Sequence, residues 1–116
     1  MPKDTIPARE LKRREAGEKC LASRGFSLFY RPGKEKTSRL AVIIKKNFGL
    51  AVERNKARRR LKALFLKTRP CFKGRFDIIV IVRSRFKELS FDEIARDWLE
   101  TLKRGGIIEK NCDFSN

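Results

Sequence analysis

The sequence predicts one small α+β domain in which helices pack on a central mixed sheet. Residues 26–31 and 39–45 alternate apolar and polar side chains, as strands do. Residues 51–67 and 91–104 carry apolar side chains at helical spacing. The length of 116 residues suits a single domain. The predicted element order is α-β-β-α-β-α, within a domain that spans residues 14–106.

One segment at each end of the chain is predicted to lie outside the domain, and a short helix is predicted to begin the domain. Residues 1–13 predict a basic flexible arm, because two prolines oppose a helix there. A short helix is expected over residues 14–23, ended by a glycine. Residues 107–116 predict a loose tail, in which Ile107 and Ile108 can still pack.

The first predicted strand has two different faces. Its apolar face is formed by Phe26, Leu28 and Tyr30. Its more polar face is formed by Ser27, Phe29 and Arg31. The turn-forming residues 32–38 separate it from the strand at 39–45. We therefore expect these two strands to pair antiparallel as a hairpin.

The last strand and helix have the clearest local signals. Residues 76–82 are almost continuously apolar and β-branched, which is typical of a strand at the centre of a sheet. Ser90 and Glu93 have the spacing of a capping box, so the last helix begins there and continues to Gly105. The order strand, helix, strand predicts a parallel crossover, which the general rule makes right-handed.

The helix at 51–67 is predicted to have a packing stripe and a basic face. Within an arc of about 100° lie Ala57, Leu61, Leu64 and Phe65. On an arc centred about 120° away lie Asn55, Arg58, Arg59 and Lys62. Pro70 requires the helix to end near Arg69.

The charge of the chain predicts a polyanionic partner. Thirty Lys and Arg residues face 14 Asp and Glu residues, so the formal net charge is +16. Nucleic acid is the leading partner class, and an anionic membrane surface comes second. No run approaches the roughly 20 apolar residues that span a bilayer, so we expect a cytoplasmic protein with no membrane partner.

The rare residue types exclude several kinds of site. The chain has no histidine, so zinc sites and histidine-based acid–base catalysis lose their usual groups. The three cysteines, Cys20, Cys71 and Cys112, are far apart and form no Cys-x-x-Cys motif. We interpret them as reduced packing residues.

Residues 53–62 carry six positive charges on one amphipathic helix. A solvated helix face is the ordinary explanation of such a run. Here, however, like charges stand four residues apart, as in Arg54 and Arg58, and repel each other. An external polyanion explains them better, because guanidinium groups form paired hydrogen bonds with phosphate. The helix residues predicted to bind RNA are Arg54, Asn55, Lys56, Arg58, Arg59, Arg60 and Lys62.

The segment 39–62 carries a specific motif. It combines a strand that ends in lysine, a glycine bend, and Ala-Val-Glu-Arg-Asn-Lys-Ala-Arg-Arg-Arg-Leu-Lys at the start of a helix. In spacing and residue types it resembles the bacterial ribonuclease P protein subunit, and the likeness extends over residues 11–104. Arg58 stands where that family has lysine, and Lys62 where it has arginine.

The resemblance implies a ribonucleoprotein enzyme. In that family a large RNA with Mg²⁺ hydrolyses the phosphodiester at the 5′ end of precursor tRNA, and the protein supplies neither nucleophile nor base. Mg²⁺ is then bound mainly by the RNA, and the protein is a monomer. The motif residues implied to meet the catalytic RNA are Arg54, Asn55, Arg58, Arg59 and Lys62.

The resemblance also implies a cleft between the sheet and an N-terminal helix, which holds the single-stranded 5′ leader. Such a cleft needs aromatic side chains on which bases stack. Phe29 is the first candidate, with Tyr30 or Phe26 in its place if the register differs, and Arg31 beside them. The alternative is that all three aromatic residues belong to the core. The predicted phosphate contacts of the groove are Arg39, Lys45 and Lys46.

Two features of the sheet follow from the resemblance. The segment between Gly25 and Arg39 is shorter than in the family, so the sheet has three strands, or four if the family's short first strand is present. The crossover into the strand at 76–82 is implied to be left-handed, against the general rule.

A structural RNA-binding protein, such as a ribosomal protein or an RNA chaperone, is the alternative function. Net charge and the basic helix fit both functions. The Arg-Asn motif directly after a strand and a bend favours the ribonuclease P subunit, because general RNA binders do not need that spacing. A protein nuclease is disfavoured, because the usual bases and carboxylate clusters are missing from the sequence.

Overall fold

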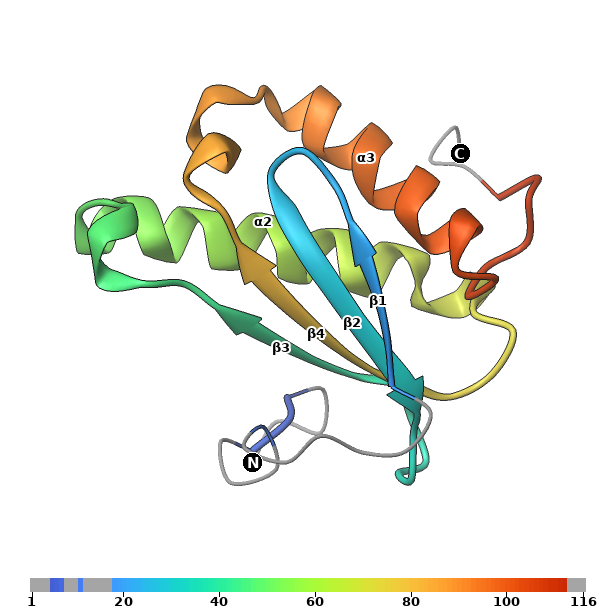
Figure 1. The fold of residues 1–116 in the computed structure, drawn as a ribbon. Coiled ribbons are helices and arrows are strands. Elements are labelled where there is room, and N and C mark those ends of the chain that lie inside the picture. The colour runs from blue at the N-terminus through green and yellow to red at the C-terminus, as the bar shows by residue number, and fades with distance from the viewer. Residues whose placement is uncertain (1–4, 8–10, 12–17, 113–116) are drawn as a thin grey trace.

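Two helices cover one face of a four-stranded sheet (Figure 1). The computed structural model describes residues 5–7, 11 and 18–112. The elements are β1 (Lys19–Ala22), β2 (Phe26–Pro32), β3 (Arg39–Ile43), α2 (Ala51–Thr68), β4 (Phe76–Val82) and α3 (Phe91–Arg104). Three short 3₁₀ turns join them: η1 (Lys46–Phe48), η2 (Arg69–Cys71) and η3 (Ser84–Glu88). The predicted α+β class and the mixed sheet are confirmed.

The sheet has the order β1-β2-β4-β3. β4 pairs antiparallel with β2 and parallel with β3, so it is an inner strand, as predicted. The predicted β2–β3 hairpin is wrong, because β4 lies between these two strands. The apolar run of β4 is covered on both faces, because Ile78 and Val80 lie in the core under the helices and Ile79 packs with Ile6 on the opposite face. The β3–α2–β4 crossover is left-handed, as the family resemblance implied (Figure 1).

The first strand of the sheet replaces part of a predicted helix. Residues 19–22 form β1, which pairs antiparallel with β2 through positions such as Leu21 and Leu28. The prediction of a helix over 14–23 is therefore wrong at 19–22, and its first residues, 14–17, lie outside the described residues. Alternation explains the outcome, because Leu21 packs toward the core while Cys20 is exposed. The sheet thus has four strands.

The main core lies between the sheet and the two helices. Its fully buried side chains come from all three parts and include Leu28, Ile78, Val80, Leu61, Phe65, Ile94, Trp98 and Leu102. The indole nitrogen of Trp98 donates to the Thr68 hydroxyl at 3.1 Å, which joins α3 to α2. Trp98 is fully buried, so this hydrogen bond satisfies its only polar atom. None of the described helices is both long and apolar enough to cross a membrane.

The predicted cap of α3 is confirmed. The Ser90 hydroxyl accepts from the backbone N–H of Glu93 at 3.1 Å, and the Glu93 carboxylate accepts from the backbone N–H of Ser90 at 2.9 Å. Arg24, in the β1–β2 turn, reaches this helix and pairs with Asp97 through two contacts of 2.9 and 3.0 Å. The small hairpin is thereby attached to α3.

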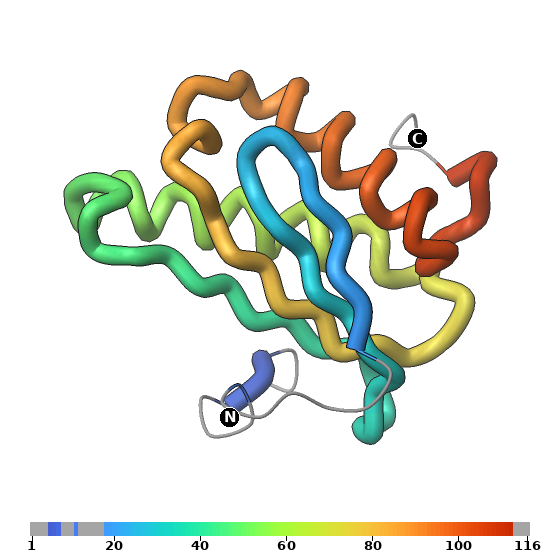
Figure 2. Tube along the Cα trace, viewed as in Figure 1, coloured from blue at the N-terminus to red at the C-terminus, as the bar shows by residue number. Residues whose placement is uncertain are grey.

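Some described residues of the predicted arm and of the predicted tail pack against the domain. In the expected arm, Ile6 is buried, and its backbone N–H donates to the Leu40 carbonyl of β3 at 3.1 Å. In the expected tail, Ile107 and Ile108 are fully buried, which is the packing that the sequence allowed for these two residues. Figure 2 shows this C-terminal segment beside the connection between α2 and β4. The rest of the predicted arm, apart from Thr5, Pro7 and Leu11, and the last part of the predicted tail, 113–116, lie outside the described residues.

Candidate nucleic-acid interface

The bend before α2 is held by the first charged residues of the helix. The Glu53 carboxylate accepts from the backbone N–H of Leu50 at 2.9 Å. The Arg54 guanidinium turns back and donates to the Gly49 carbonyl at 2.7 Å and to the Lys46 carbonyl at 3.4 Å. Arg54, which the sequence predicted to meet RNA, is therefore half-buried and positions the bend.

The predicted basic face of α2 is exposed as a group. The side chains of Ala57, Leu61, Leu64 and Phe65 are buried, as the helical spacing predicted. On the exposed side lie Asn55, Arg58, Arg59 and Lys62. Within the described residues, no ion pair joins Arg58, Arg59 or Lys62 to a carboxylate. These three cations are free to meet an external anion.

A hollow separates the basic face of α2 from the outer edge of the sheet. Its volume is about 200 Å³, and Arg58 and Lys62 stand on its helix side. Residues 40–42 of β3 form the opposite side, with Phe65 and Thr5 completing the lining. Because β3 is an edge strand, a chain that follows this hollow contacts both the cations of α2 and the sheet edge.

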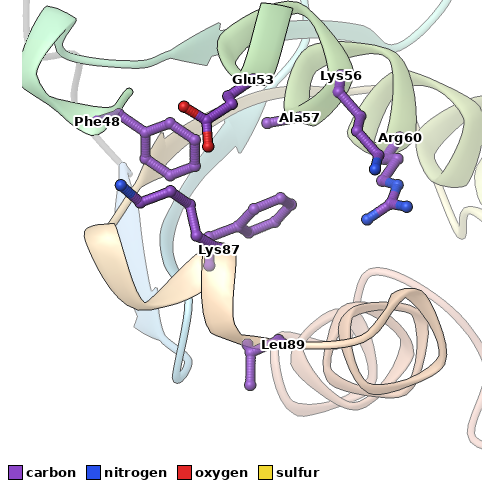
Figure 3. Close-up of a pocket in the computed structure, with 8 residues that line it drawn as sticks. Phe48, Glu53, Lys56, Ala57, Arg60, Lys87 and Leu89 are labelled. Carbon is purple, nitrogen blue, oxygen red and sulfur yellow. The ribbon is translucent and has the colours of Figure 1, made fainter. Parts of the chain in front are cut away.

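A second hollow lies on the other flank of α2, between this helix and η3. Figure 3 shows Lys56 and Arg60 of α2 and Lys87 of η3 around it, together with the Glu53 carboxylate. Its apolar lining includes Phe48 and Ala57. The volume is about 140 Å³. Two of the cations stand over aromatic rings, Lys87 over Phe48 at 5.2 Å and Arg60 over Phe91 at 5.5 Å. These ring contacts restrict the cations before any ligand arrives.

The face of the sheet that points away from the helices carries Phe29, as predicted. Phe29 stands in one row with Ile79 and Ala41 across β2, β4 and β3. Ile6 packs on this row and forms with it a second, small apolar cluster. Phe29 is half-buried, so part of its ring stays accessible. We call this surface the open face of the sheet.

The other two aromatic candidates for the leader cleft belong to the helix side. Phe26 is buried in the core, and its ring lies 6.1 Å from that of Trp98. The Tyr30 hydroxyl donates to the Gly105 carbonyl at the end of α3, at 3.2 Å. For Phe26 and Tyr30 the core interpretation is therefore correct.

Two predicted cationic contacts are buried instead. Arg31, Asp77 and Arg39 stand side by side on the open face, because the register pairs Asp77 with both arginines. Arg39 donates to the Asp77 carboxylate through Nε at 3.1 Å and Nη2 at 2.9 Å. Arg31 Nε lies 3.8 Å from Asp77 Oδ2. Arg31 is 2% exposed and Arg39 6%, so neither can reach a phosphate in this arrangement.

One cation of the open face was not predicted from the sequence. Arg83 directly follows β4, and its guanidinium donates to the Ser27 hydroxyl at 2.7 and 3.2 Å. Ser27 faces the same side as Phe29, so Arg83 is held at that end of the open face. The alternation of β4, in which Asp77, Ile79 and Ile81 point to this face, was the signal that could have identified it. The predicted Lys45 and Lys46 are exposed just beyond the end of β3.

The arrangement provides binding groups and no metal centre. Among the described residues, no group of three or more His, Cys, Asp or Glu side chains could hold a metal ion. The carboxylates nearest the interface, Glu53 and Asp77, are already engaged with Leu50 and Arg39. The described residues do not fit Mg²⁺. Chemically, the surface can bind phosphates along α2 and stack one base at Phe29.

Proteins of known structure share this fold. A structure of the Staphylococcus aureus RNase P protein matches with a TM-score of 0.78 and 26% identity, covering 90% of this chain and 95% of that one. The RNase P protein from Thermotoga maritima matches with a TM-score of 0.73 and 28% identity, covering 88% and 97%.

Curated relatives agree with the structural likeness. The ribonuclease P protein component of Syntrophomonas wolfei is 26% identical over 95 residues, covering 82% of this chain and 80% of that protein. That of Thermotoga maritima is 31% identical over 90 residues, covering 74% and 77%. The family model for ribonuclease P matches residues 11–106, nearly the whole chain. This chain therefore belongs to the ribonuclease P protein family.

Proposed function

We propose that this chain is the protein subunit of ribonuclease P, which binds the catalytic RNA and the 5′ leader of precursor tRNA and assists removal of the leader. One observation carries the proposal: the exposed cations Arg58, Arg59 and Lys62 of α2 have no carboxylate partner among the described residues. They occupy the positions of the Arg-Asn motif through which the family meets its RNA.

The basic face of α2 binds the catalytic RNA in this proposal. Like charges at i and i+4, such as Arg58 and Lys62, repel each other in the free protein. A phosphate backbone removes that repulsion and releases the counterions that RNA had condensed. The hollow between α2 and η3 adds Lys56, Arg60 and Lys87 to the cations within reach of an RNA strand that crosses the helix.

The open face of the sheet holds the single-stranded leader in this proposal. Phe29 offers a half-buried ring on which a base stacks. Arg83 supplies a cation at one end of the same face, oriented by Ser27. The opposite end is occupied by the buried ion pair of Arg39 with Asp77. The leader therefore contacts the sheet between Phe29 and the Arg83 end.

The chemistry belongs to the RNA in this proposal. Mg²⁺ is assigned to the catalytic RNA, as the family resemblance implies, and the protein binds and positions. The α2 cations lower the electrostatic cost of bringing two polyanions, the RNA and the precursor, together. The protein acts in the cytoplasm as a monomer within this complex.

Cleavage of precursor tRNA by the matching ribonuclease P RNA tests the function. At low Mg²⁺, addition of the protein should lower the Mg²⁺ requirement and tighten binding of leader-bearing precursor, while the protein alone should cleave nothing. Mature tRNA without a leader is the matched ligand, and its binding should gain little.

Equal cleavage kinetics with and without the protein would contradict the proposal. If the protein also bound unrelated structured RNAs as tightly, the structural RNA-binding function would be favoured instead. If the protein tightened binding of leader-bearing precursor but not of mature tRNA, the result would support its contacts with both the catalytic RNA and the leader.

A further inference from the structure

Two cysteines that the sequence keeps far apart touch in the structure. Cys71 ends η2, directly after α2, and Cys112 lies beyond α3, 41 positions later. Their Sγ atoms are 2.6 Å apart, and no disulfide joins the two residues. The prediction of three separate packing cysteines did not include this contact.

The backbone builds the contact independently of the sulfur atoms. The N–H of Lys73 donates to the Ile107 carbonyl at 2.8 Å, and Phe72 forms an antiparallel bridge with Ile108. A turn closed by the N–H of Cys112 and the Glu109 carbonyl, at 3.1 Å, then brings Cys112 back toward Cys71.

Buried side chains anchor both segments. Ile107 and Ile108 are fully buried, and the Phe72 ring packs edge-on against Phe65 at 5.8 Å and Phe76 at 6.2 Å. The two cysteines therefore meet without any rearrangement of the chain.

Their exposure suits reaction with a small reagent. Cys71 and Cys112 are both half-buried, so the pair is neither sealed in the core nor open to large molecules. Cys20, in contrast, is exposed on β1 and faces the open face of the sheet. Cys20 thus has no part in the pair, and it is the cysteine from which disulfides between two molecules would form.

We propose that Cys71 and Cys112 form a reversible intramolecular disulfide when the protein meets a two-electron oxidant of the peroxide class. One thiolate attacks the O–O bond of the peroxide and becomes a sulfenic acid, with release of the first water. The second thiol attacks that sulfur, forms the S–S bond and releases a second water. In sum, two thiols and one hydrogen peroxide give one disulfide and two waters, and a dithiol reductant reverses the change.

The disulfide would join the end of α2 to the chain beyond α3. It closes a loop that contains β4 and α3, and so restricts the unfolded chain more than the folded one. The pair lies past the C-terminal end of α2, whereas Asn55 and Arg58 lie in its N-terminal half. Oxidation should therefore raise the melting temperature and leave RNA affinity unchanged.

The test uses the full chain in two variants. Cys20→Ser keeps the pair and removes dimer formation, and Cys20→Ser/Cys112→Ser is the matched control that cannot close the loop. After treatment with hydrogen peroxide, Cys20→Ser should lose both thiols to alkylation, weigh two hydrogen atoms less, and melt several degrees higher until dithiothreitol reverses the change. The control should show none of these three changes.

Two results would overturn the proposal. The first is that Cys20→Ser keeps two alkylatable thiols after oxidation, or carries added oxygen atoms instead of a disulfide. The second is that the double variant shows the same rise in melting temperature. Circular dichroism of both reduced variants establishes that they fold. RNA binding is not part of this readout, so failure of the ribonuclease P function would leave it standing.

Discussion

The arginines of the sheet and the arginines of α2 are the same residue type in opposite roles. Arg31 and Arg39 are buried on either side of Asp77, and Arg39 donates to both oxygens of its carboxylate. Arg58 and Arg59 are exposed and have no carboxylate partner in the described part of the chain. A buried carboxylate therefore determines which of these cations hold the fold and which stay exposed at the surface.

The register of the sheet creates this difference. Asp77 interrupts the apolar run of β4 at the one row where Arg31 of β2 and Arg39 of β3 stand beside it. A buried charge is stable only when it is paired and hydrogen-bonded. On α2, Glu53 is the nearest acid, and it is used to cap the helix.

Asp77→Asn should have the largest effect, because it removes the buried negative charge that two buried guanidinium groups share. We expect the free energy of unfolding to fall by about 3–5 kcal/mol, as measured by urea denaturation. RNA affinity, measured where the variant is still folded, should change little. This result would show that Arg31 and Arg39 serve stability and not RNA binding.

Asp92→Asn is the matched control, since Asp92 is an exposed carboxylate in the first turn of α3. Its effect should stay within about 0.5 kcal/mol. If Asp77→Asn were as stable as the control, the buried charges would not be the interaction that stabilises this end of the sheet.

Local patterns predicted the elements, but long-range pairing decided which charges are exposed. The β-branched run at 76–82 and the Ser90–Glu93 cap are short-range signals, and both elements were predicted at their observed positions. The burial of Arg39 depends on a strand that follows 37 residues later entering between β2 and β3. No periodicity within residues 39–45 contains that information.

In the candidate site, too, local patterns predicted some features and tertiary structure decided the others. Helical spacing correctly separated the exposed Arg58 and Arg59 from the buried stripe of α2. It could not show that Arg54 turns back to the carbonyls of the preceding bend, because the path of that bend is a tertiary feature. Strand alternation placed Phe29 on the correct face, but the burial of Arg31 required the register with Asp77.

Arg58→Ala/Arg59→Ala is expected to weaken binding of the catalytic RNA without changing stability by more than about 0.5 kcal/mol. The slope of log K against log salt should become shallower by about one unit for each lost phosphate contact. Lys36→Ala, an exposed cation in the 33–38 turn, is the control and should keep the wild-type slope. An unchanged slope in the double variant would show that Arg58 and Arg59 make no phosphate contact.

Phe29→Leu tests the open face with a smaller expected effect. Leucine preserves the apolar contact with Ile6 and Ile79 but removes the aromatic ring. Binding of leader-bearing precursor should weaken by about 1 kcal/mol, at the lower end of the range for base stacking, because the ring is half-buried. Binding of mature tRNA should not change. Equal losses for both ligands would indicate a general folding defect instead of a leader contact.

The ion pairs of Arg24 are expected to have the smallest effect on stability. Unlike the buried arginines of the sheet and the arginines of α2 that have no carboxylate partner among the described residues, Arg24 is paired but exposed to solvent. Arg24 lies 2.9 Å from Asp97 and 3.3 Å from Glu93, and its side chain is 42% exposed. The pKa of Glu93 lies below its ordinary value of 4.5, first because the backbone N–H of Ser90 donates to it, and in smaller part because of Arg24. Water and salt screen such a pair, so its contribution is small.

The sign of the pH dependence follows from the lowered pKa of Glu93. Stability from this carboxylate is fully present above pH 4.5 and is lost as the pH falls through its lower folded-state pKa. Glu93→Gln should therefore melt at a slightly lower temperature at neutral pH and lose less on acidification. Glu100→Gln is the control, an exposed α3 carboxylate without an ion pair in the described chain. If the melting temperatures of both variants fell on acidification as that of the wild type does, the Arg24–Glu93 pair would contribute nothing to stability. Burial, as at Asp77, would then be what makes a charged group of this protein matter for stability.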